Sequence, residues 1–310
     1  MTPPLVYLGL DVAKATLAAS LDGTRFTLAN TLAGHAALCA RIAAYGSPMQ
    51  VICEATGGYE RAVVTTLRQA AVPVSVLHPT RVRQLARGLG YLAKNDPLDS
   101  EMLARIGPLL TPAPTPAPAE GVEELAALVS RREQLAELIR REKQHRETTT
   151  VAVLRRDLEQ SLAALQKRLE KIEALIQKHL HAHPVLAAKA ARLQEAPGVG
   201  PVGAATLLAV LPELGHGSRE RLSSLAGLAP RDHESGAYRG ARHVHGGRPK
   251  ARRILYLCAL SAARHHPQLR LFYNRLRAAG KAPKVALIAT ARKLLTLLHA
   301  ALKNPHFALA

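Results

Sequence analysis

Residues 111–119 read TPAPTPAPA, and this run of proline and alanine constrains the fold more than any other feature of the sequence. A proline-rich segment is extended and semi-rigid, and proline continues neither a helix nor a central strand. We therefore predict a linker at 111–119 that divides the chain into separately folded parts. The 310 residues are enough for two or three compact domains.

The part before the linker, residues 1–110, alternates between strand-like and helix-like patterns. Residues 5–29 alternate apolar with small or polar side chains, and Asp22-Gly23 is typical of a hairpin turn. Further strand-like and helix-like stretches follow, with helices expected at 33–45, 59–70 and 97–107 and strands at 51–55 and 72–77. This order predicts an α/β domain with a mixed sheet.

Residues 120–190 are expected to be helical. A heptad seam of apolar side chains runs through Leu158, Leu162, Leu165, Leu169, Ile172 and Ile176. A weaker stripe precedes it, at Leu125, Leu128, Leu135 and Ile139, and the polar residues 140–150 suit a turn between two helices. The seam fits an ordinary helical pair packed on the rest of the chain, or a coiled coil that joins protomers. We favour the coiled coil, because a bare seam needs a partner surface.

Residues 191–310 form a mainly α-helical domain in this interpretation. APGVGPVG at 196–203 fits a helix-hairpin-helix, in which Gly198 and Gly200 would offer backbone N–H groups to a phosphate. A simple turn between two helices explains the same residues nearly as well. The tail, roughly 250–302, has the pattern of amphipathic helices rich in Arg and Lys.

The last third of the chain carries most of the positive charge. Residues 196–310 contain 18 Lys and Arg against 4 Asp and Glu, which is +14 of the net charge of +19. Nucleic acid is the expected partner of so basic a region. A membrane is the weaker interpretation, because no run of 18 or more apolar residues is available to span a bilayer. The three scattered cysteines are typical of buried thiols in a reducing cytoplasm.

Four acidic residues of the first domain point to chemistry. Asp11 and Glu54 end two expected strands, and Asp96 and Asp99 lie on one face of an expected helix. Each alone fits a cap, a turn or a solvated charge. Together they suit a cage for hard divalent cations, because Mg²⁺ prefers oxygen ligands and phosphoryl transfer uses two such ions. Lys14 and the ATGG stretch at 55–58 add charge and backbone for a phosphate path.

These motifs resemble a known family. DVAK at 11–14, EATGGY at 54–59 and KNDPLDSEMLA at 94–104 resemble the DEDD transposases of bacterial insertion sequences, in the insertion-sequence 110 family. APGVGPVGAATLLA at 196–209 and the stretch from LAGLAPRDHESG at 225–236 to residue 260 resemble the second conserved region of that family. The resemblance covers nearly the whole chain in order.

The resemblance implies a fold and a mechanism. It implies an RNase H-like first domain related to Holliday-junction resolvases, with Asp11, Glu54, Asp96 and Asp99 as the ligands of Mg²⁺, for which Mn²⁺ could substitute. It implies a serine nucleophile at Ser235. It also implies that a structured guide RNA pairs with double-stranded DNA of the element ends and the target. The protein would work as a homo-oligomer, a dimer or a tetramer, assembled through residues 120–190 and associated with the nucleoid.

Ser235 lies in a basic, glycine-rich stretch, HESGAYRGARHVHGGRPKARR, at 233–253. From composition alone Ser235 is a turn residue, since Ser-Gly is a common loop pair. Given the resemblance, we expect a nucleophile, with phosphate-neutralising side chains at Arg239, Arg242, Arg248, Lys250, Arg252 and Arg253. Two alternatives remain: a nuclease that uses metal ions only, of the Holliday-junction type, and a non-enzymatic protein that binds nucleic acid.

Overall fold

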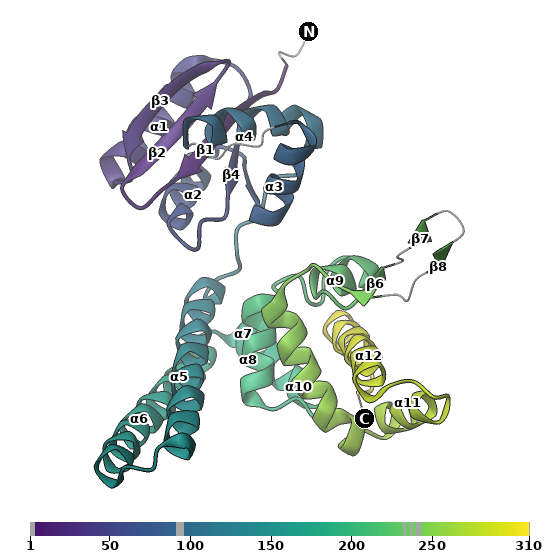
Figure 1. The fold of residues 1–310 in the computed structure, drawn as a ribbon. Coiled ribbons are helices and arrows are strands. Elements are labelled where there is room, and N and C mark those ends of the chain that lie inside the picture. Colours follow the sequence, from purple (N-terminus) through teal and green to yellow (C-terminus); the bar gives the residue numbers. More distant parts are fainter. Residues whose placement is uncertain (1–3, 91–95, 232–233, 236–237, 240–242, 310) are drawn as a thin grey trace. The chain divides into compact units, whose positions relative to one another are not determined.

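The computed structural model describes residues 4–309 except for 91–95, 232–233, 236–237 and 240–242, and the side chains of 96–98, 231, 234–235 and 238–239 lie outside that description. The chain divides into two compact units, Met1–Ala117 (unit 1) and Pro118–Ala310 (unit 2). The division falls within the Pro/Ala segment. Figure 1 shows a sheet with helices in unit 1 and a mainly helical unit 2.

Unit 1 contains a five-stranded mixed sheet of order β3-β2-β1-β4-β5. Its strands are β1 (Val6–Val12), β2 (Thr16–Leu21), β3 (Thr24–Ala29), β4 (Met49–Glu54) and β5 (Val74–Leu77). β1, β2 and β3 pair antiparallel, whereas β4 runs parallel to β1 and β5 runs parallel to β4. Asp22 and Gly23 have positive φ angles of 44° and 77° in the turn between β2 and β3. The predicted mixed sheet and its first turn are confirmed.

Helices cover both faces of this sheet. α1 (Leu32–Tyr45) and α2 (Glu60–Gln69) pack on one face, where Leu38 and Val63 join buried leucines of β1 and β2. α3 (Pro79–Gly88) and α4 (Asp96–Leu110) belong to a separate cluster on the other face, with Ile52 of β4 and Leu77 of β5. The helices predicted at 33–45, 59–70 and 97–107 are present, and α3 was not predicted.

The Pro/Ala segment is extended, as expected, but it is fixed to unit 1. The backbone N–H of Thr115 donates to the carbonyl of Val74 (2.8 Å), and the backbone N–H of Val76 donates to Thr115 Oγ1 (2.9 Å). Arg68 donates to the carbonyls of Thr115 and Pro116, both at 3.2 Å. A regular edge strand would pair through the N–H group of every second residue, but proline has no N–H. The segment instead pairs through Thr115 and through backbone carbonyls. The segment therefore covers the outer edge of β5.

Unit 2 begins with a long helical hairpin. α5 (Val122–Thr148) and α6 (Ala152–Ala182) are joined by a turn at 149–151 (Figure 1). The predicted seam of α6 faces α5 in part: Ile176 is buried in one cluster with Leu125, and Arg132 pairs with Glu173 at 2.8 Å. Part of the seam thus has a partner within the same chain, and the coiled coil between protomers stays a prediction.

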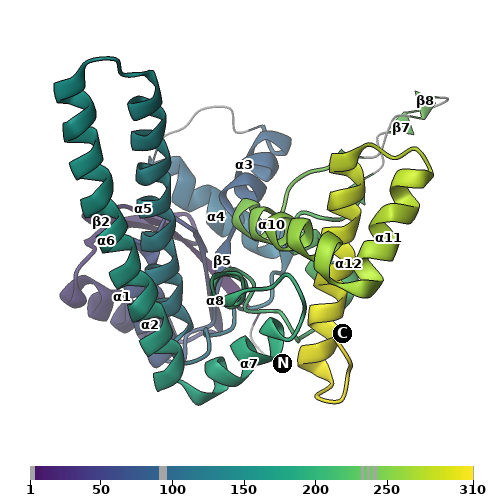
Figure 2. The ribbon, with the colours of Figure 1, turned by 90° about the horizontal axis from the view of Figure 1, so that it is seen from below.

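The remainder of unit 2 packs around one apolar core. Its helices are α7 (Pro184–Gln194), α8 (Pro201–Val210), α9 (Arg219–Leu225), α10 (Pro249–His265), α11 (Pro267–Ala278) and α12 (Pro283–Lys303). Five of these six helices begin with proline, which suits the first turn because its missing N–H has no helical partner there. α10, α11 and α12 lie side by side in Figure 2. Between α9 and α10 the chain forms two short antiparallel pairs, β6 (Pro230–Arg231) with β9 (His243–Val244) and β7 (Glu234–Ser235) with β8 (Tyr238–Arg239).

α12 corrects one expectation from the sequence. Within the described residues it is the one helix whose length of 21 residues and apolar composition would allow it to cross a membrane. Half of its apolar window is buried inside unit 2, where Leu294 and Leu298 are fully enclosed. A buried core helix has the same length and composition, so α12 is explained by the core that it completes.

Two buried histidines of unit 2 predict a dependence of stability on pH. His299 is 5% exposed, and its Nδ1 accepts a hydrogen bond from the backbone N–H of Gly215 at 3.1 Å. Burial lowers the pKa of His299 and also that of the fully buried His266. As the pH falls, these two histidines are protonated in the unfolded chain before they are protonated in the folded chain. Their contribution to the free energy of unfolding is therefore complete above about pH 6.5 and is lost as the pH falls through the lower folded-state pKa values.

Urea unfolding at about pH 7 and about pH 5 checks this expectation. The free energy of unfolding should be lower at about pH 5 than at about pH 7. His299→Gln should make this difference smaller, because glutamine stays neutral and still offers an acceptor to the N–H of Gly215. The exposed His265→Gln is the matched control and should leave the pH dependence as it is. An equal dependence in both variants would contradict the role assigned to His299.

Candidate functional site

Asp11 and Glu54 are neighbours on one face of the sheet in unit 1. The parallel register pairs Leu10 with Cys53, so Asp11 and Glu54 follow as the next residues of β1 and β4. Side chains alternate between the two faces of a strand. Asp11 lies four residues after Tyr7, and Glu54 two after Ile52, and both of these apolar residues pack beneath α3 and α4. Asp11 and Glu54, each half-buried, therefore share the face that α4 covers.

α4 crosses this face close to β1. A Cβ added at Gly9 would lie 1.9 Å from the carbonyl oxygen of Ser100, and one at Gly107 would lie 2.4 Å from the Tyr7 ring. Later residues of α4 thus meet earlier residues of β1, and the first turn of α4 lies toward the carboxyl end of the strand. Asp99, half-buried, stands beside Ser100 in that turn. The two strand carboxylates and this helix turn are brought to one end of one face.

Gly9→Ala is expected to destabilise unit 1 strongly. The added Cβ would overlap backbone atoms of α4 at Ser100 and Ala104, and backbone cannot swing aside as a side chain can. Overpacking of this kind costs about 3 kcal/mol. Thermal unfolding followed by circular dichroism should show the loss, and Gly88→Ala, whose Cβ meets nothing within 4 Å, should show little change. Equal melting temperatures for the two variants would contradict the close approach of α4 to β1.

The metal cage predicted from the four carboxylates stays a prediction. Asp96 is the first residue of α4, but its side chain is outside the described part of the chain. Among the side chains that are described, no three His, Cys, Asp or Glu residues are close enough to hold a metal ion. The donor types still suit a hard cation, because carboxylates at the ends of β1 and β4 and on α4 share one face.

The loop after β4 is held by Glu60, a carboxylate that no sequence motif indicated. Glu60 accepts hydrogen bonds from the backbone N–H groups of Thr56 (3.2 Å) and Gly58 (2.8 Å) and from Thr56 Oγ1 (3.0 Å). Burial alone would raise the pKa of Glu60, but these hydrogen bonds outweigh it and lower the pKa. Two N–H groups of the predicted phosphate path are therefore occupied within the chain. Lys14, in the turn after β1, is exposed.

Ser235 lies in a short hairpin of unit 2. Ser235 pairs with Tyr238 across β7 and β8, and Glu234 pairs with Arg239. These strands stand clear of helices α10 to α12 in Figures 1 and 2. The side chains of Ser235 and Arg239, and the whole of Arg242, lie outside the described residues. The nucleophile therefore stays a prediction, and the described backbone places Ser235 opposite Tyr238.

The base of this hairpin is tightly fixed. Gly227 and Gly247 have φ angles of 66° and 64°, and a Cβ at Gly247 would lie 2.3 Å from the backbone nitrogen of Gly227. Arg252 Nη1 donates to the carbonyls of Gly227 (3.3 Å) and Gly246 (3.1 Å). Arg252, predicted as a phosphate contact, thus joins the segments that enter and leave the hairpin.

Other basic residues of this stretch also have partners within unit 2. Arg248 donates to both carboxylate oxygens of Glu213 (2.6 and 2.7 Å) and to the carbonyl of Val210 (3.0 Å). Burial alone would raise the pKa of Glu213, but the Arg248 guanidinium lowers it. Lys250 and Arg253 both approach Glu133 of α5, at 2.8 and 3.9 Å. These contacts fasten α10 to its neighbours, a role that the sequence did not reveal, and phosphate binding by these residues stays a prediction.

The two glycines of the predicted helix-hairpin-helix have different surroundings. Gly198 has a φ of 103°, and a Cβ there would lie 2.6 Å from the backbone nitrogen of Ala262 in α10. The backbone at residue 198 therefore packs so closely on that of α10 that only glycine fits there. Gly200 is exposed ahead of α8, and a Cβ there would meet nothing within 4 Å. Only Gly200 leaves space beside the helix N-terminus for a phosphate.

Comparison with known proteins places the chain in a family. Residues 190–274 match the family described as Transposase IS116/IS110/IS902, and residues 8–149 match the DEDD transposases of IS110. The chain is 27% identical over 312 residues to the pilin gene-inverting protein of Moraxella lacunata, covering 96% of each chain. It is 33% identical over 162 residues to an uncharacterized 43.6 kDa protein of insertion element IS110 from Streptomyces coelicolor, covering 52% of this chain and 39% of that one. The match at 8–149 covers most of unit 1 and the start of unit 2, and the match at 190–274 lies within unit 2. The chain belongs to the IS110 family of transposases.

Proposed function

We propose that this transposase cuts and rejoins DNA with divalent metal ions held by carboxylates of unit 1 and with Ser235 of unit 2 as nucleophile. The observation that carries the proposal is the shared face of β1, β4 and α4, which brings Asp11, Glu54 and the first turn of α4 together. The sheet order and its mixed strand directions support the RNase H-like fold that the family resemblance implies.

Asp11, Glu54, Asp96 and Asp99 are the proposed metal ligands. Carboxylate oxygens suit Mg²⁺, with Mn²⁺ as a substitute. When bound, the metal would supply electrostatic stabilisation of the reacting phosphate. Glu60 supports this site indirectly, because it fixes the loop that follows Glu54.

Ser235 is proposed to form a temporary bond with DNA. Its Oγ attacks a backbone phosphorus, so that an O–P bond to serine forms while the P–O bond to one strand end breaks. The serine proton passes to a base, and the released strand end leaves as a hydroxyl after taking up a proton. The phosphodiester energy is kept in the phosphoserine bond, so rejoining needs no ATP. Arg239 of the same hairpin and Arg242, three residues further along the sequence, are the side chains proposed to neutralise the phosphate.

A rejoining enzyme also agrees with the relative from Moraxella lacunata. That protein is named for inverting a pilin gene, and an inversion requires that cut strands be joined again. The similarity extends over 96% of both chains. The two proteins are proposed to share the class of reaction.

The proposed partners are double-stranded DNA of the element ends and target, a structured guide RNA and further copies of the chain, acting on the nucleoid in the cytoplasm. Exposed apolar side chains on the helical hairpin support assembly: Leu138 is 41% exposed, Leu154 54% and Leu175 47%. A second copy of the hairpin is the proposed partner that would cover these side chains.

Recombination in vitro tests the proposal. The purified protein is incubated with a plasmid carrying the element ends, with and without RNA transcribed from the flanking noncoding segment, in Mg²⁺ or in chelator. Joined products that need both the RNA and the metal are expected, together with a protein–DNA adduct resistant to detergent. Products formed in chelator would overturn the metal part, and equal products without RNA would overturn guidance by RNA.

A further inference from the structure

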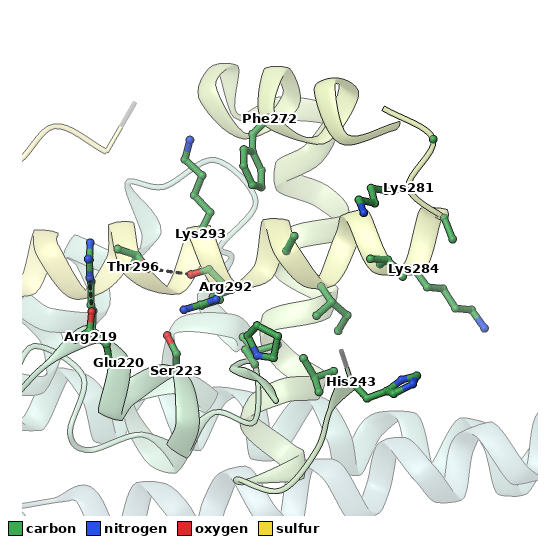
Figure 3. A pocket seen from close by; sticks show the side chains of 18 residues that line it. Arg219, Glu220, Ser223, His243, Phe272, Lys281, Lys284, Arg292, Lys293 and Thr296 are labelled. Carbon is green, nitrogen blue, oxygen red and sulfur yellow. Dashed lines mark hydrogen bonds and ion pairs between the residues drawn. The ribbon is translucent and has the colours of Figure 1, made fainter. Parts of the chain in front are cut away.

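Unit 2 contains a groove that is separate from the serine hairpin. It has a volume of about 1000 Å³ and lies between α9, the β6–β9 pair, Phe272 of α11, the turn at 280–282 and α12 as far as Thr296. Figure 3 shows side chains from these elements converging on it, with Arg292 of α12 opposite Ser223 of α9. The volume is at the upper end of what small-ligand sites occupy. A groove of this size accepts a short stretch of a polymer.

The groove has an apolar floor. Leu228 is buried at its base, and Phe272, Ile288 and Val244 are half-buried in its lining. Val285, also in the lining, is 56% exposed. An exposed branched aliphatic side chain beside a concave apolar surface is typical of a place where a ligand excludes water.

The rim of the groove is cationic. Lys281, Lys284 and Arg292 are exposed there, and Lys293 lies over the Phe272 ring with its Nζ 4.7 Å from the ring centroid. Across the described residues no carboxylate pairs with any of these four cations. Arg219, on the other side, is neutralised by Glu220 at 2.6 Å. The rim therefore keeps an excess of positive charge that an anion would balance.

This rim contrasts with the basic stretch that the sequence singled out. In that stretch Arg248 forms an ion pair with Glu213, and Lys250 and Arg253 form ion pairs with Glu133. The cations of the groove have no such partners within the described part of the chain, so they are better placed for an external polyanion. From Lys284 to Lys293 a helix rises about 14 Å, which is enough for several phosphates of one strand.

We propose that this groove binds a single-stranded segment of nucleic acid, with phosphates on the cationic rim and bases against the apolar floor. A chain of the IS110 transposase family acts on nucleic acid, which makes a strand the polyanion of choice. Duplex bases are stacked inside the helix and cannot reach a floor, whereas unpaired bases can. The floor is aliphatic apart from Phe272, whose ring Lys293 already covers, so it holds bases without preference for sequence.

Binding of labelled strands by the full chain tests the inference. The double variant Lys284→Gln/Arg292→Gln is compared with Arg264→Gln/Arg270→Gln, a pair of exposed cations that lies outside the groove and changes the net charge equally. The probes are an oligothymidylate, the corresponding oligouridylate RNA and a DNA duplex. The two single-stranded arms tell which nucleic acid the groove prefers.

The groove variant should lower the affinity for at least one single strand about tenfold. It should also lower the slope of log affinity against log salt by about 1.4, because each lost phosphate contact removes about 0.7. The control pair should leave the slope unchanged. Val285→Ala should weaken single-strand binding a few-fold without weakening duplex binding, since it alters only the floor.

Three results would overturn the inference. The first is an equal effect of the groove pair and the control pair. The second is an equal loss of duplex and single-strand binding in the groove variant. The third is loss of binding to polyglutamate or to phosphatidylglycerol vesicles at least as large as the loss for strands, which would assign the groove to an acidic protein or a membrane. Ser235→Ala serves as a reference: it should bind strands as the wild type does, so failure of the serine chemistry and failure of groove binding are separate outcomes.

Discussion

Ser235→Ala is expected to abolish the covalent protein–DNA adduct and to slow strand cleavage by about 10³-fold or more. The substitution removes the hydroxyl oxygen that is proposed to bond to phosphorus, and alanine is small enough to replace serine in a short strand. A suicide DNA substrate, denaturing electrophoresis and mass spectrometry of the linked peptide would measure both losses. Binding of the same DNA should be unchanged, because the proposed role of Ser235 is chemical.

Ser224→Ala is the matched control for this experiment. Ser224 lies in α9, near the base of the same hairpin, and is half-buried. It should form the adduct at the wild-type rate. If Ser235→Ala cleaves DNA at the wild-type rate, and neither this variant nor the wild-type protein forms an adduct, the chain would instead be a nuclease that uses metal ions only. An adduct that persists in Ser235→Ala would move the nucleophile to another residue.

Asp11→Asn is expected to reduce cleavage by about 10³-fold at unchanged DNA affinity. Asparagine keeps the size of the side chain but removes the negative charge that holds a hard cation, and in site-directed studies the loss of one such group is of this order. Cleavage assays in Mg²⁺ and Mn²⁺, with affinity measured by fluorescence anisotropy, separate catalysis from binding. Asp99→Asn should behave in the same way.

Asp22→Asn is the control for the carboxylates. Asp22 lies in the β2–β3 turn with a φ of 44°, which asparagine tolerates, and it accepts a hydrogen bond from Tyr45. Asp22→Asn changes the net charge of unit 1 by the same amount as Asp11→Asn, but it should leave cleavage at the wild-type rate. Wild-type transposition by Asp11→Asn would favour the non-enzymatic interpretation, in which the chain only binds nucleic acid.

Much of unit 1 could be predicted because its signals are local. The Asp22-Gly23 turn, the alternation along β1 and β2 and the apolar run of β4 each depend on neighbouring residues. α3 was missed because it offers only two buried residues, Val82 and Ala86, at a spacing of four. So short a stripe does not stand out from a loop in a sequence.

The partners of charged residues could not be predicted, because they are distant in the chain. Arg248 meets Glu213 across 35 residues, and Lys250 meets Ser130 across 120. In the sequence these cations look the same as the unpartnered ones of α12. The groove was invisible for a related reason: its lining comes from four regions between residues 219 and 296. Only the folded chain brings them together.

The Pro/Ala segment has a consequence for the order in which the chain is made. Val76 precedes its partner Thr115 by 39 residues, so the outer edge of β5 leaves the ribosome well before its cover does. An uncovered strand edge is a template for pairing with other chains. A fragment that stops at residue 110 would contain every strand and helix of unit 1 and still expose that edge. A fragment that continues to Ala117 would carry its own protection from the moment it is released.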